Sequence, residues 1–562
     1  MRKELLLLGA FGMLTTATLC AQEFHLQPTP QEYITQKDSV DIPQQYQILS
    51  GNSVQDGPAL PLLRSLMPEE VLGASFRVYI GVKGDKIIKK YQHRIPRKSE
   101  GYFLKIEKDC IVIAGADERG AYYGVQTLAQ LLALDKLPLA EVTDYPDVPY
   151  RGVVEGFYGA PWSQEARIRQ LDFYGRNKMN VYIYGPKDDP YHRTPNWRKP
   201  YPAREGEELK VLVNRAKENN VIFYWAIHPG QDIRWNEEDR SLLLQKFESM
   251  YQLGVRGFAV FFDDISGEGT KADKQAELLN YIDDHFVKVK RDVAPLILCP
   301  TEYNKSWTDV EGGYLTTLGD KLNEGIKVMW TGDMVVATID KSTLDFVNPL
   351  LKRKAYIWWN FPVSDYVQDH LLLGPVYGNG LDIKDDMSAF VSNPMEHAEA
   401  SKISLYSVAD YTWNMENYDS EASWKHAVRD LMPLHAEYLE IFAAHNSDPG
   451  QNGHRFRREE SVAIQPALSA LLKAYQEKNE IDEDAYRQVA EECRKIIVAA
   501  DGLLASGNEN RPLITEIRPW LIQFKQVGEY GAEVLNMIRL RQQKDAFIGS
   551  YEHARALLVL MG

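Results

Sequence analysis

Short apolar segments alternate with amphipathic segments from residue 148 to residue 433, and this alternation limits the possible folds of the chain. Eight segments are short, apolar and rich in β-branched or aromatic residues, as strands buried on both faces of a parallel sheet are. They are residues 152–157, 181–185, 222–227, 257–262, 296–299, 327–330, 355–359 and 403–408. Helical patterns such as residues 164–178 separate most of these segments. Eight strand–helix units of this kind predict an α/β fold, namely a (β/α)8 barrel over residues 148–433.

Two further regions flank the predicted barrel. Residues 22–147 mix short strand-like segments with one clear helical pattern at 120–134, which predicts a small α/β domain. After residue 434 the strand signals stop, and apolar residues recur at helical spacing from Leu468 to Tyr475. We therefore predict a helical bundle over residues 434–562.

The first 21 residues have the layout of a secretory signal. A basic start at Arg2 and Lys3 precedes an apolar stretch and a small residue at Ala21, after which we expect cleavage. This predicts an exported protein, periplasmic or secreted. Cys20 raises the alternative of a lipid-anchored N-terminus, which is less favoured because the residues before it do not match a lipoprotein signal. No later segment approaches the roughly 18 apolar residues of a membrane span, so no transmembrane segment is expected.

Charge and cysteine content exclude several classes of partner and cofactor. The chain has 64 Lys and Arg against 79 Asp and Glu, a formal net charge of −15. Nucleic acids and anionic membranes require a basic surface, so neither is expected as a partner. The cysteines after Ala21, which are Cys110, Cys299 and Cys493, are scattered and form no CxxC pair. We therefore predict no disulfide framework, no metal site and no cofactor.

Residues that follow the predicted strands share one rim of the barrel, and this rim is where barrel enzymes carry their active sites. Polar or aromatic residues follow every predicted strand. In chain order they are Tyr158, Lys187, His228, Asp263 with Asp264, Tyr303, Thr331, Asn360 with Asp365, and Asp410 with Trp413. The pattern predicts an enzyme cleft at this rim.

Two adjacent acids, Asp263 and Asp264, follow the fourth predicted strand and are the candidate catalytic residues. Consecutive strand side chains point to opposite sides, but at a strand-to-loop exit both can turn toward one pocket. Crowding pushes the pKa values of two carboxyl groups apart, so that one stays charged and the other holds a proton. Glycoside hydrolysis requires this combination. The alternatives are a solvated pair that caps the next helix and a divalent-metal site.

Aromatic side chains near the strand ends favour the sugar-cleaving interpretation, because sugars dock their apolar faces onto aromatic rings. These aromatic residues are Tyr158, Tyr303, Trp330, Trp358, Trp359 and Trp413.

Four segments carry distinctive motifs, namely residues 151–159 (RGVVEGFYG), 184–191 (YGPKDDPY), 262–265 (FDDI) and 357–365 (IWWNFPVSD). These motifs resemble those of glycoside hydrolase family 84, which contains the bacterial β-N-acetylglucosaminidases related to human O-GlcNAcase. The resemblance covers the predicted barrel from about residue 150 to residue 413 and extends into the helices, where Asn452-Gly453-His454 also looks familial. Residues 115–128 are similar to the helix of the small α/β domain that precedes hexosaminidase barrels.

The resemblance implies substrate-assisted catalysis with retention of configuration. In this family the 2-acetamido oxygen of the sugar attacks its own anomeric carbon and forms an oxazoline. Asp263 resembles the residue that orients the acetamido N–H, and Asp264 resembles the general acid and base. Tyr303 matches the position that hydrogen-bonds the developing oxazoline, and Asn360 matches one that holds the reacting sugar.

Two further groups of residues are implied by the resemblance. The residues expected to hold sugar hydroxyls are Gly156, Lys187, Asp365 and Asn393, with Asp365 reading the 4- and 6-hydroxyls. The residues expected to form the pocket for the acetyl group are Tyr158, Cys299, Thr331, Val335 and Trp358. His228 is expected to be a structural neighbour of the acids.

The resemblance thus implies a glycosidase that removes terminal β-linked N-acetylglucosamine from glycoconjugates, the expected carbohydrate partner. A hyaluronan-cleaving endo-hexosaminidase and, less favoured, a non-catalytic sugar-binding protein remain as alternatives. A pocket built around one terminal sugar favours exo-cleavage, and the sequence contains no extended basic groove for a polyanion. The physiological aglycone stays open, as does the oligomeric state, for which a homodimer is one candidate.

Overall fold

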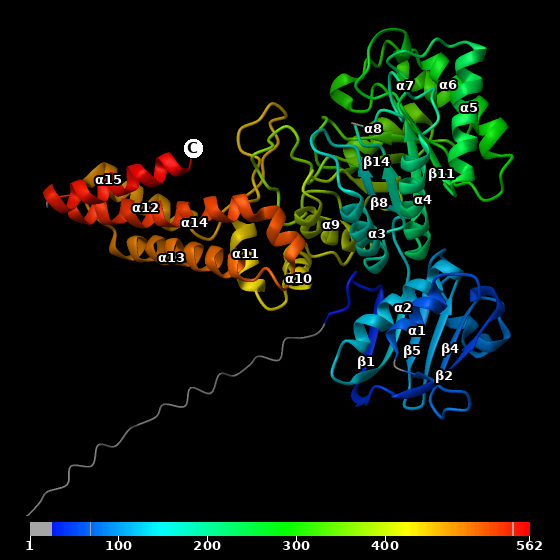
Figure 1. Ribbon diagram of the computed structural model, residues 1–562, viewed down its shortest axis with the longest axis horizontal. Coiled ribbons are helices and arrows are strands. Elements are labelled where there is room, and N and C mark those ends of the chain that lie inside the picture. Colours follow the sequence, from blue (N-terminus) through cyan, green and yellow to red (C-terminus); the bar gives the residue numbers. More distant parts are fainter. Residues whose placement is uncertain (1–24, 68, 188, 542–543, 562) are drawn as a thin grey trace, which may run out of the picture.

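The chain folds into an N-terminal α/β domain, a barrel and a C-terminal array of helices (Figure 1). The computed structural model describes residues 25–67, 69–187, 189–541 and 544–561. The predicted signal segment 1–21 therefore lies outside the described residues. The predicted fold class is confirmed in all three parts.

The N-terminal domain is a seven-stranded mixed sheet with its two α-helices on one face and a short 3-10 helical segment on the other. Its strands are β1 (Glu32–Val40), β2 (Gln45–Ser50), β3 (Glu69–Glu70), β4 (Arg77–Val82), β5 (Tyr102–Ile106), β6 (Cys110–Gly115) and β7 (Leu137–Asp144), in the order β1-β7-β5-β6-β4-β2-β3. Alternate side chains of a strand point to opposite faces. Leu104 accordingly belongs to the core beneath α1 (Ala59–Leu66) and α2 (Glu118–Leu132), whereas Phe103 packs with Ile88 on the other face.

Eight parallel strands close into a barrel. They are β8 (Tyr150–Glu155), β9 (Val181–Tyr184), β10 (Ile222–Ile227), β11 (Gly257–Phe261), β12 (Ile297–Cys299), β13 (Lys327–Trp330), β14 (Ala355–Trp359) and β15 (Met387–Ser392). The two-residue period of each strand divides its side chains between two cores. Val154 and Trp358 lie inside the barrel, whereas Val153 and Trp359 pack outward against the surrounding helices.

Seven helices surround the strands and are started by sequence-encoded caps. They are α3 (Gln164–Arg176), α4 (Ala203–Glu218), α5 (Glu237–Gln252), α6 (Ala272–Ile282), α7 (Tyr314–Lys321), α8 (Lys341–Leu351) and α9 (Ala398–Trp413). The side chains of Ser163, Asn236 and Asp340 accept hydrogen bonds from backbone N–H groups in the first turns of α3, α5 and α8. Such caps satisfy donors that have no partner within the helix.

The predicted eighth strand at residues 403–408 is wrong, because this segment lies inside α9. The eighth strand is β15, and every residue of α9 is buried. A helix buried on all sides has no polar face, so a short apolar segment of it cannot be told from a buried strand by periodicity. Asp410 and Trp413 are consequently absent from the rim at the carboxyl ends of the barrel strands. Trp413 instead donates its indole N–H to Asp144 of the N-terminal domain at 2.8 Å.

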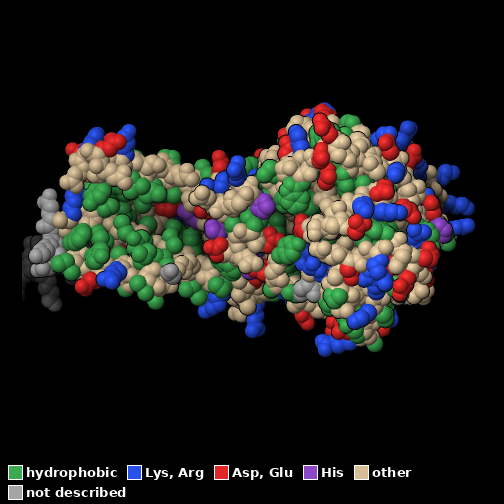
Figure 2. Space-filling model, turned by 90° about the horizontal axis from the view of Figure 1, so that it is seen from above, with side chains coloured by type: hydrophobic (Ala, Val, Ile, Leu, Met, Phe, Trp, Pro, Cys, Tyr) green, Lys and Arg blue, Asp and Glu red, His purple; other side chains and the backbone are tan. Residues whose placement is uncertain are grey.

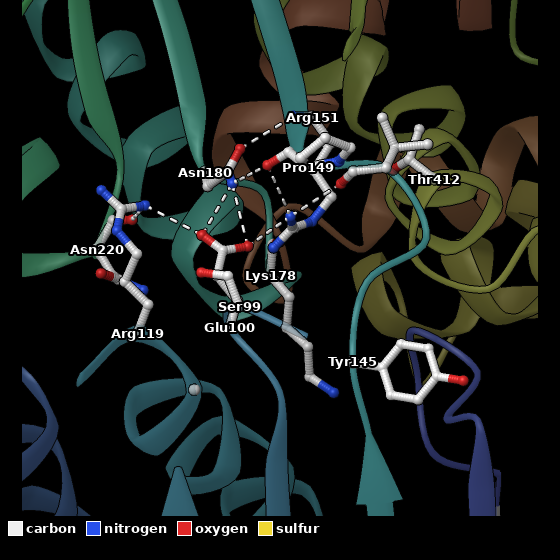
Figure 3. Close-up of polar contacts among 12 residues, drawn as sticks. Ser99, Glu100, Arg119, Tyr145, Pro149, Arg151, Lys178, Asn180, Asn220 and Thr412 are labelled. Atoms are coloured by element: carbon white, nitrogen blue, oxygen red, sulfur yellow. Dashed lines mark hydrogen bonds and ion pairs between the residues drawn. The ribbon is translucent and has the colours of Figure 1, made fainter. Parts of the chain in front are cut away.

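A buried charge cluster joins the N-terminal domain to the amino end of the barrel (Figure 3). The Glu100 carboxylate lies 2.7 Å from the Arg151 guanidinium and 3.3 Å from Arg119, and it accepts hydrogen bonds from Asn180 Nδ2 at 2.9 and 3.1 Å. The side chain of Arg151 is 0% exposed and that of Glu100 is 7% exposed. These two charges are therefore interdependent, because either one alone would be buried without compensation.

Replacement of Glu100 by Gln is expected to destabilise the protein by on the order of 3 kcal/mol, because it leaves the Arg151 charge buried and unneutralised. The Gln side chain keeps an acceptor for Asn180, which places the loss at the lower end of the usual range. Urea unfolding measures the change. The control is Glu70→Gln, which breaks an exposed ion pair with Arg64 and should cost at most about 1 kcal/mol. Equal effects of the two substitutions would contradict the prediction.

The C-terminal helices extend away from the barrel (Figure 1). They are α10 (Ser420–Leu431), α11 (Ala436–Ala444), α12 (Gln465–Lys478), α13 (Glu483–Ala505), α14 (Arg511–Leu540) and α15 (Lys544–Leu560). Hydrophobic side chains gather on the surface of this elongated lobe (Figure 2), and its exposed apolar residues include Leu468, Leu472 and Tyr551. Within the described residues, no helix is both long and apolar enough to cross a membrane.

Candidate active site

A cavity of about 380 Å³ opens at the carboxyl ends of the barrel strands. Every residue that the sequence assigns to catalysis, sugar binding or the acetyl pocket lines this cavity. These residues are Gly156, Tyr158, Lys187, Asp263, Asp264, Cys299, Tyr303, Thr331, Val335, Trp358, Asn360, Asp365 and Asn393. These residues come from the carboxyl ends of seven strands, β8, β9 and β11 to β15, which parallel strands bring to one rim.

A sharp turn after β11 brings the two adjacent acids into the same cavity. The parallel pairing continues one residue past β11, because the Phe262 N–H donates to the Cys299 carbonyl at 2.9 Å. Asp264 then adopts a left-handed backbone conformation with φ of 52°. This turn overrides the usual alternation, so Asp263 and Asp264 both line the cavity. Asp and Asn tolerate the left-handed region better than most residues, and such positions concentrate at functional sites.

Asp263 is buried and held as a carboxylate. Lys187 donates to its Oδ2 at 2.6 Å, and His228 Nε2 lies 3.3 Å from its Oδ1. Burial alone would raise the pKa of Asp263, but the Lys187 ammonium and the His228 ring outweigh it and hold that pKa below its usual range. His228 bonds to the Asp263 carbonyl oxygen at 2.8 Å and lines no part of the cavity, as expected of a structural neighbour.

One oxygen of Asp263 remains available. Its buried Oδ1 has no hydrogen-bond donor among the described residues, since the His228 ring is aligned with the carbonyl oxygen instead. A buried carboxylate oxygen without a donor is unfavourable unless a ligand supplies one. Asp263 therefore offers an acceptor for an N–H or O–H group of a molecule in the cavity.

Asp264 is exposed at the mouth of the cavity and is oriented by two phenols. Tyr303 donates to its Oδ1 at 2.8 Å and Tyr158 donates to its Oδ2 at 2.9 Å. Burial, reinforced by the Asp264 charge, raises the pKa of Tyr158 to about 12 and raises that of Tyr303 further. Both hydroxyls therefore stay protonated at neutral pH and act as donors to Asp264.

The opposite wall is a hydrogen-bonded network around Asn360. Its Oδ1 accepts hydrogen bonds from Trp358 Nε1 at 2.8 Å and from Asn393 Nδ2 at 2.9 Å, and its Nδ2 donates to the Val335 carbonyl at 2.8 Å. A Cβ on Gly156 would lie 2.5 Å from the Trp358 ring, so only glycine permits this approach. The network therefore fixes the orientation of the Trp358 indole, which lines the cavity.

Asp365 occupies a partly desolvated position at the same wall. Its Oδ2 accepts a hydrogen bond from the Tyr158 backbone N–H at 2.9 Å. Burial raises the pKa of Asp365 above its usual value, and the Tyr158 N–H and His454 act in the opposite direction.

Four of the five residues predicted for the acetyl pocket, namely Cys299, Thr331, Val335 and Trp358, are small, apolar or aromatic groups that line the cavity, and all but Val335 are buried. Such a lining suits a methyl-bearing group. Tyr158 differs from this set, because its half-exposed side chain donates to Asp264.

Three aromatic residues that were expected near the site lie elsewhere. Trp330 and Trp359 pack in the core between the barrel and its helices, and Trp413 joins the core of the N-terminal domain. A one-residue step along a strand reverses the direction of the side chain, so Trp358 points into the barrel and the adjacent Trp359 points outward toward the helices.

The sequence analysis assigns no role at the site to five further lining residues, namely Trp307, Val336, Val363, Tyr366 and His454. His454 comes from the segment after α11, and its ring packs edge-on against Tyr366 at 4.9 Å between centroids. Burial lowers the pKa of His454, while Asp365 opposes the shift. The familial Asn452-Gly453-His454 motif was the available signal in the sequence. Because the motif is far from the barrel strands in the chain, the sequence did not show that His454 reaches the cavity.

Across the described residues, no group of three or more His, Cys, Asp or Glu side chains is arranged to hold a metal ion.

Family models account for all three parts of the chain. A model described as beta-N-acetylglucosaminidase matches residues 151–444, which include the barrel from Arg151 onward and every described lining residue of the cavity except His454. The chain belongs to glycoside hydrolase family 84. A model of the bacterial family 84 post-catalytic domain matches residues 460–561, and a model of domain 2 of glycosyl hydrolase family 20 matches residues 23–145.

Individual relatives agree with this membership. The solved structure of CpGH84B is 32% identical, with a TM-score of 0.88 and coverage of 96% of both chains. A variant of the O-GlcNAc hydrolase of Thermobaculum terrenum is 27% identical, with a TM-score of 0.66 over 73% of this chain and 90% of that one. The protein O-GlcNAcase of Rattus norvegicus is 35% identical over 276 residues, which are 47% of this chain. This match spans only 30% of the rat protein.

Proposed function

We propose that this protein is a β-N-acetylglucosaminidase that releases terminal β-linked N-acetylglucosamine with retention of configuration, using the acetamido group of the substrate as nucleophile. The observation that carries the proposal is Asp263, a buried carboxylate with one oxygen engaged by Lys187 and the other free to accept a hydrogen bond. The chain's family membership and the small, partly apolar lining around Cys299 support the same activity.

In the first step, Asp263 accepts the acetamido N–H of the bound sugar, which turns the acetamido oxygen toward the anomeric carbon. Attack forms the oxazoline, and the positive charge that grows on nitrogen is balanced by the Asp263 carboxylate. Asp264 donates a proton to the leaving oxygen as the glycosidic bond breaks. Tyr303 and Tyr158 orient Asp264 for this transfer.

In the second step, Asp264 removes a proton from water while the water attacks the anomeric carbon. The oxazoline opens and the acetamido group is restored, so two successive inversions give net retention. Asp365, Asn393 and Lys187 line the cavity with groups able to bind sugar hydroxyls.

A hyaluronan-cleaving activity is the second candidate, and the charges of the cavity disfavour it. Lys187 is the one Lys or Arg among the described lining residues, and it is engaged by Asp263. A polyanion would meet the carboxylates of Asp264 and Asp365 at the same opening, which would repel it.

We further propose that the protein is exported, as the layout of residues 1–21 predicts. A homodimer is one candidate for the oligomeric state.

Fluorination of the acetamido methyl group is expected to slow turnover of β-aryl glycosides progressively from acetyl to trifluoroacetyl, because each fluorine makes the carbonyl oxygen less nucleophilic. Initial rates on the acetyl, mono-, di- and trifluoroacetyl substrates measure the trend. NMR should detect the β-anomer as the first product. A flat response to fluorination would indicate an enzymic nucleophile, and an α-anomer as first product would exclude retention.

A further inference from the structure

The segment that follows β8, residues 156–162, is fastened to the loop between β15 and α9. The Ala160 backbone N–H donates to Glu396 Oε2 at 2.7 Å, and the Trp162 indole donates to the Met395 carbonyl at 3.1 Å. Glu396 lies outside the set of residues that line the cavity. Its contact with the segment is therefore made outside the cavity.

The Glu396 carboxylate lies directly against backbone at Gly159. This glycine has φ of 123°, and a Cβ added to it would lie 2.4 Å from Glu396 Oε2. A carboxylate that accepts a backbone N–H forms a charge-assisted hydrogen bond, which is short and directional. Glu396 thus holds the backbone of Gly159 and Ala160 in one place.

The residue that immediately precedes this contact is Tyr158, whose hydroxyl donates to Asp264 at 2.9 Å. Tyr158 is 45% exposed, so packing alone does not hold its ring. Its backbone is fixed on one side by the bond from its N–H to Asp365 and on the other by Glu396. The position of the Tyr158 hydroxyl therefore depends on both bonds.

Glu396 is itself fixed by the C-terminal helices. Helix α9 begins two residues later, and the N–H of Ala400 in its first turn donates to Glu516 of α14 at 2.7 Å. The His397 ring packs edge-on against Trp520 of α14, with 4.7 Å between centroids. The loop that carries Glu396 is thus held between the barrel and α14.

We propose that Glu396 is a positioning residue for the reaction: by holding Gly159 and Ala160 it places the Tyr158 hydroxyl on Asp264 and so orients the acid that protonates the leaving group. The inference rests on the proposed function. It assigns to Glu396 an effect on proton donation and none on the attack of the acetamido group.

The test compares Glu396→Ala, Glu396→Asp and Glu396→Gln on β-N-acetylglucosaminides with leaving groups of high and low pKa. Misplacement of a catalytic group by about 1 Å can cost up to 10²-fold, so we expect Glu396→Ala to lose roughly 10-fold or more in kcat/KM for alkyl glycosides. The loss should fall below about 3-fold for a dinitrophenyl glycoside, which departs without a proton. Glu396→Asp should behave like Glu396→Ala, because its carboxylate is one methylene too short to reach Ala160.

Glu396→Gln retains an acceptor for the Ala160 N–H and should remain within about 3-fold of the wild type on every substrate. The matched control is Glu416→Ala, which removes a glutamate with an 80% exposed side chain whose nearest cation, Lys384, lies 3.7 Å away. This control should leave both rates unchanged. Circular dichroism and thermal unfolding establish that each variant is folded.

A double-mutant cycle with Tyr158→Phe decides whether Glu396 acts through Tyr158. In the Tyr158→Phe background, Glu396→Ala should cost less than about 2-fold on the alkyl glycoside, because coupled residues are not additive. Additive losses, or equal losses for both leaving groups, would overturn the role of Glu396 while leaving the proposed function intact. Failure of the wild type to cleave any of the glycosides would overturn both.

Discussion

Asp264→Asn is expected to reduce kcat/KM for β-N-acetylglucosaminides with alkoxide leaving groups, such as a serine-linked sugar, by roughly 10²–10⁴-fold, the usual worth of a positioned general acid. The loss follows from its place at the mouth of the cavity, where Tyr303 and Tyr158 direct its carboxyl group. Asn also tolerates the left-handed backbone found at this position, so the turn should survive the substitution.

The loss in Asp264→Asn should shrink for a dinitrophenyl glycoside, because dinitrophenolate leaves without protonation. For such leaving groups the basic limb of the pH profile should flatten in this variant. Steady-state rates across a series of aryl and alkyl glycosides measure the dependence on leaving-group pKa. A loss of the same size for every leaving group, in a variant that is still folded, would contradict the assignment of Asp264 as the acid.

Asp263→Asn is expected to reduce kcat by roughly 10²–10³-fold for all leaving groups, comparable to the removal of one group that stabilises a developing charge. The substitution removes the anion that balances the oxazolinium nitrogen, so it affects the attack and not the departure. The dependence on leaving-group pKa should stay like that of the wild type, with the basic limb retained. If leaving-group sensitivity appeared in Asp263→Asn alone, the roles of the two acids would be exchanged.

Asp263→Asn has a structural consequence that needs its own control. Lys187, whose side chain is 9% exposed, would lose the carboxylate that lies 2.6 Å from its ammonium group. An uncompensated buried charge destabilises a fold. The double variant Asp263→Asn with Lys187→Met removes both charges and should recover stability without recovering activity. Thermal unfolding of the single and double variants separates the electrostatic loss from the catalytic one.

The parts of the fold that could be predicted are those whose secondary structure follows from the local pattern of apolar and polar residues. The first seven barrel strands are apolar segments separated by polar-faced helices, and local periodicity is enough to recognise them. Residues 403–408 are equally apolar but belong to α9, which is buried on every side. Strand β15 follows a connection without a helix, residues 360–386, so the expected strand–helix rhythm breaks at that point. Periodicity cannot detect such a break.

The residues of the candidate site likewise fall into those that could be predicted from the sequence and those that could not. Once the barrel is assumed, topology alone places Lys187, Asp263, Tyr303 and Asn360 at one rim, because parallel strands end together. The same rule gives no access to His454, which reaches the cavity from beyond α11. The rule also does not predict the role of Glu396, whose contact with Ala160 joins residues 236 positions apart.

Local sequence patterns predict a barrel, flanking α/β and helical parts, and a pair of adjacent acids after one strand, because each of these depends on residues close together in the chain. The packing of distant segments buries Asp263 against Lys187 and leaves Asp264 exposed, hydrogen-bonded to Tyr158 and Tyr303. The different environments of the two neighbouring carboxyl groups come from residues distant in the chain. Burial and the distances between charges are properties of the packed molecule, and these quantities separate the roles of two chemically identical side chains.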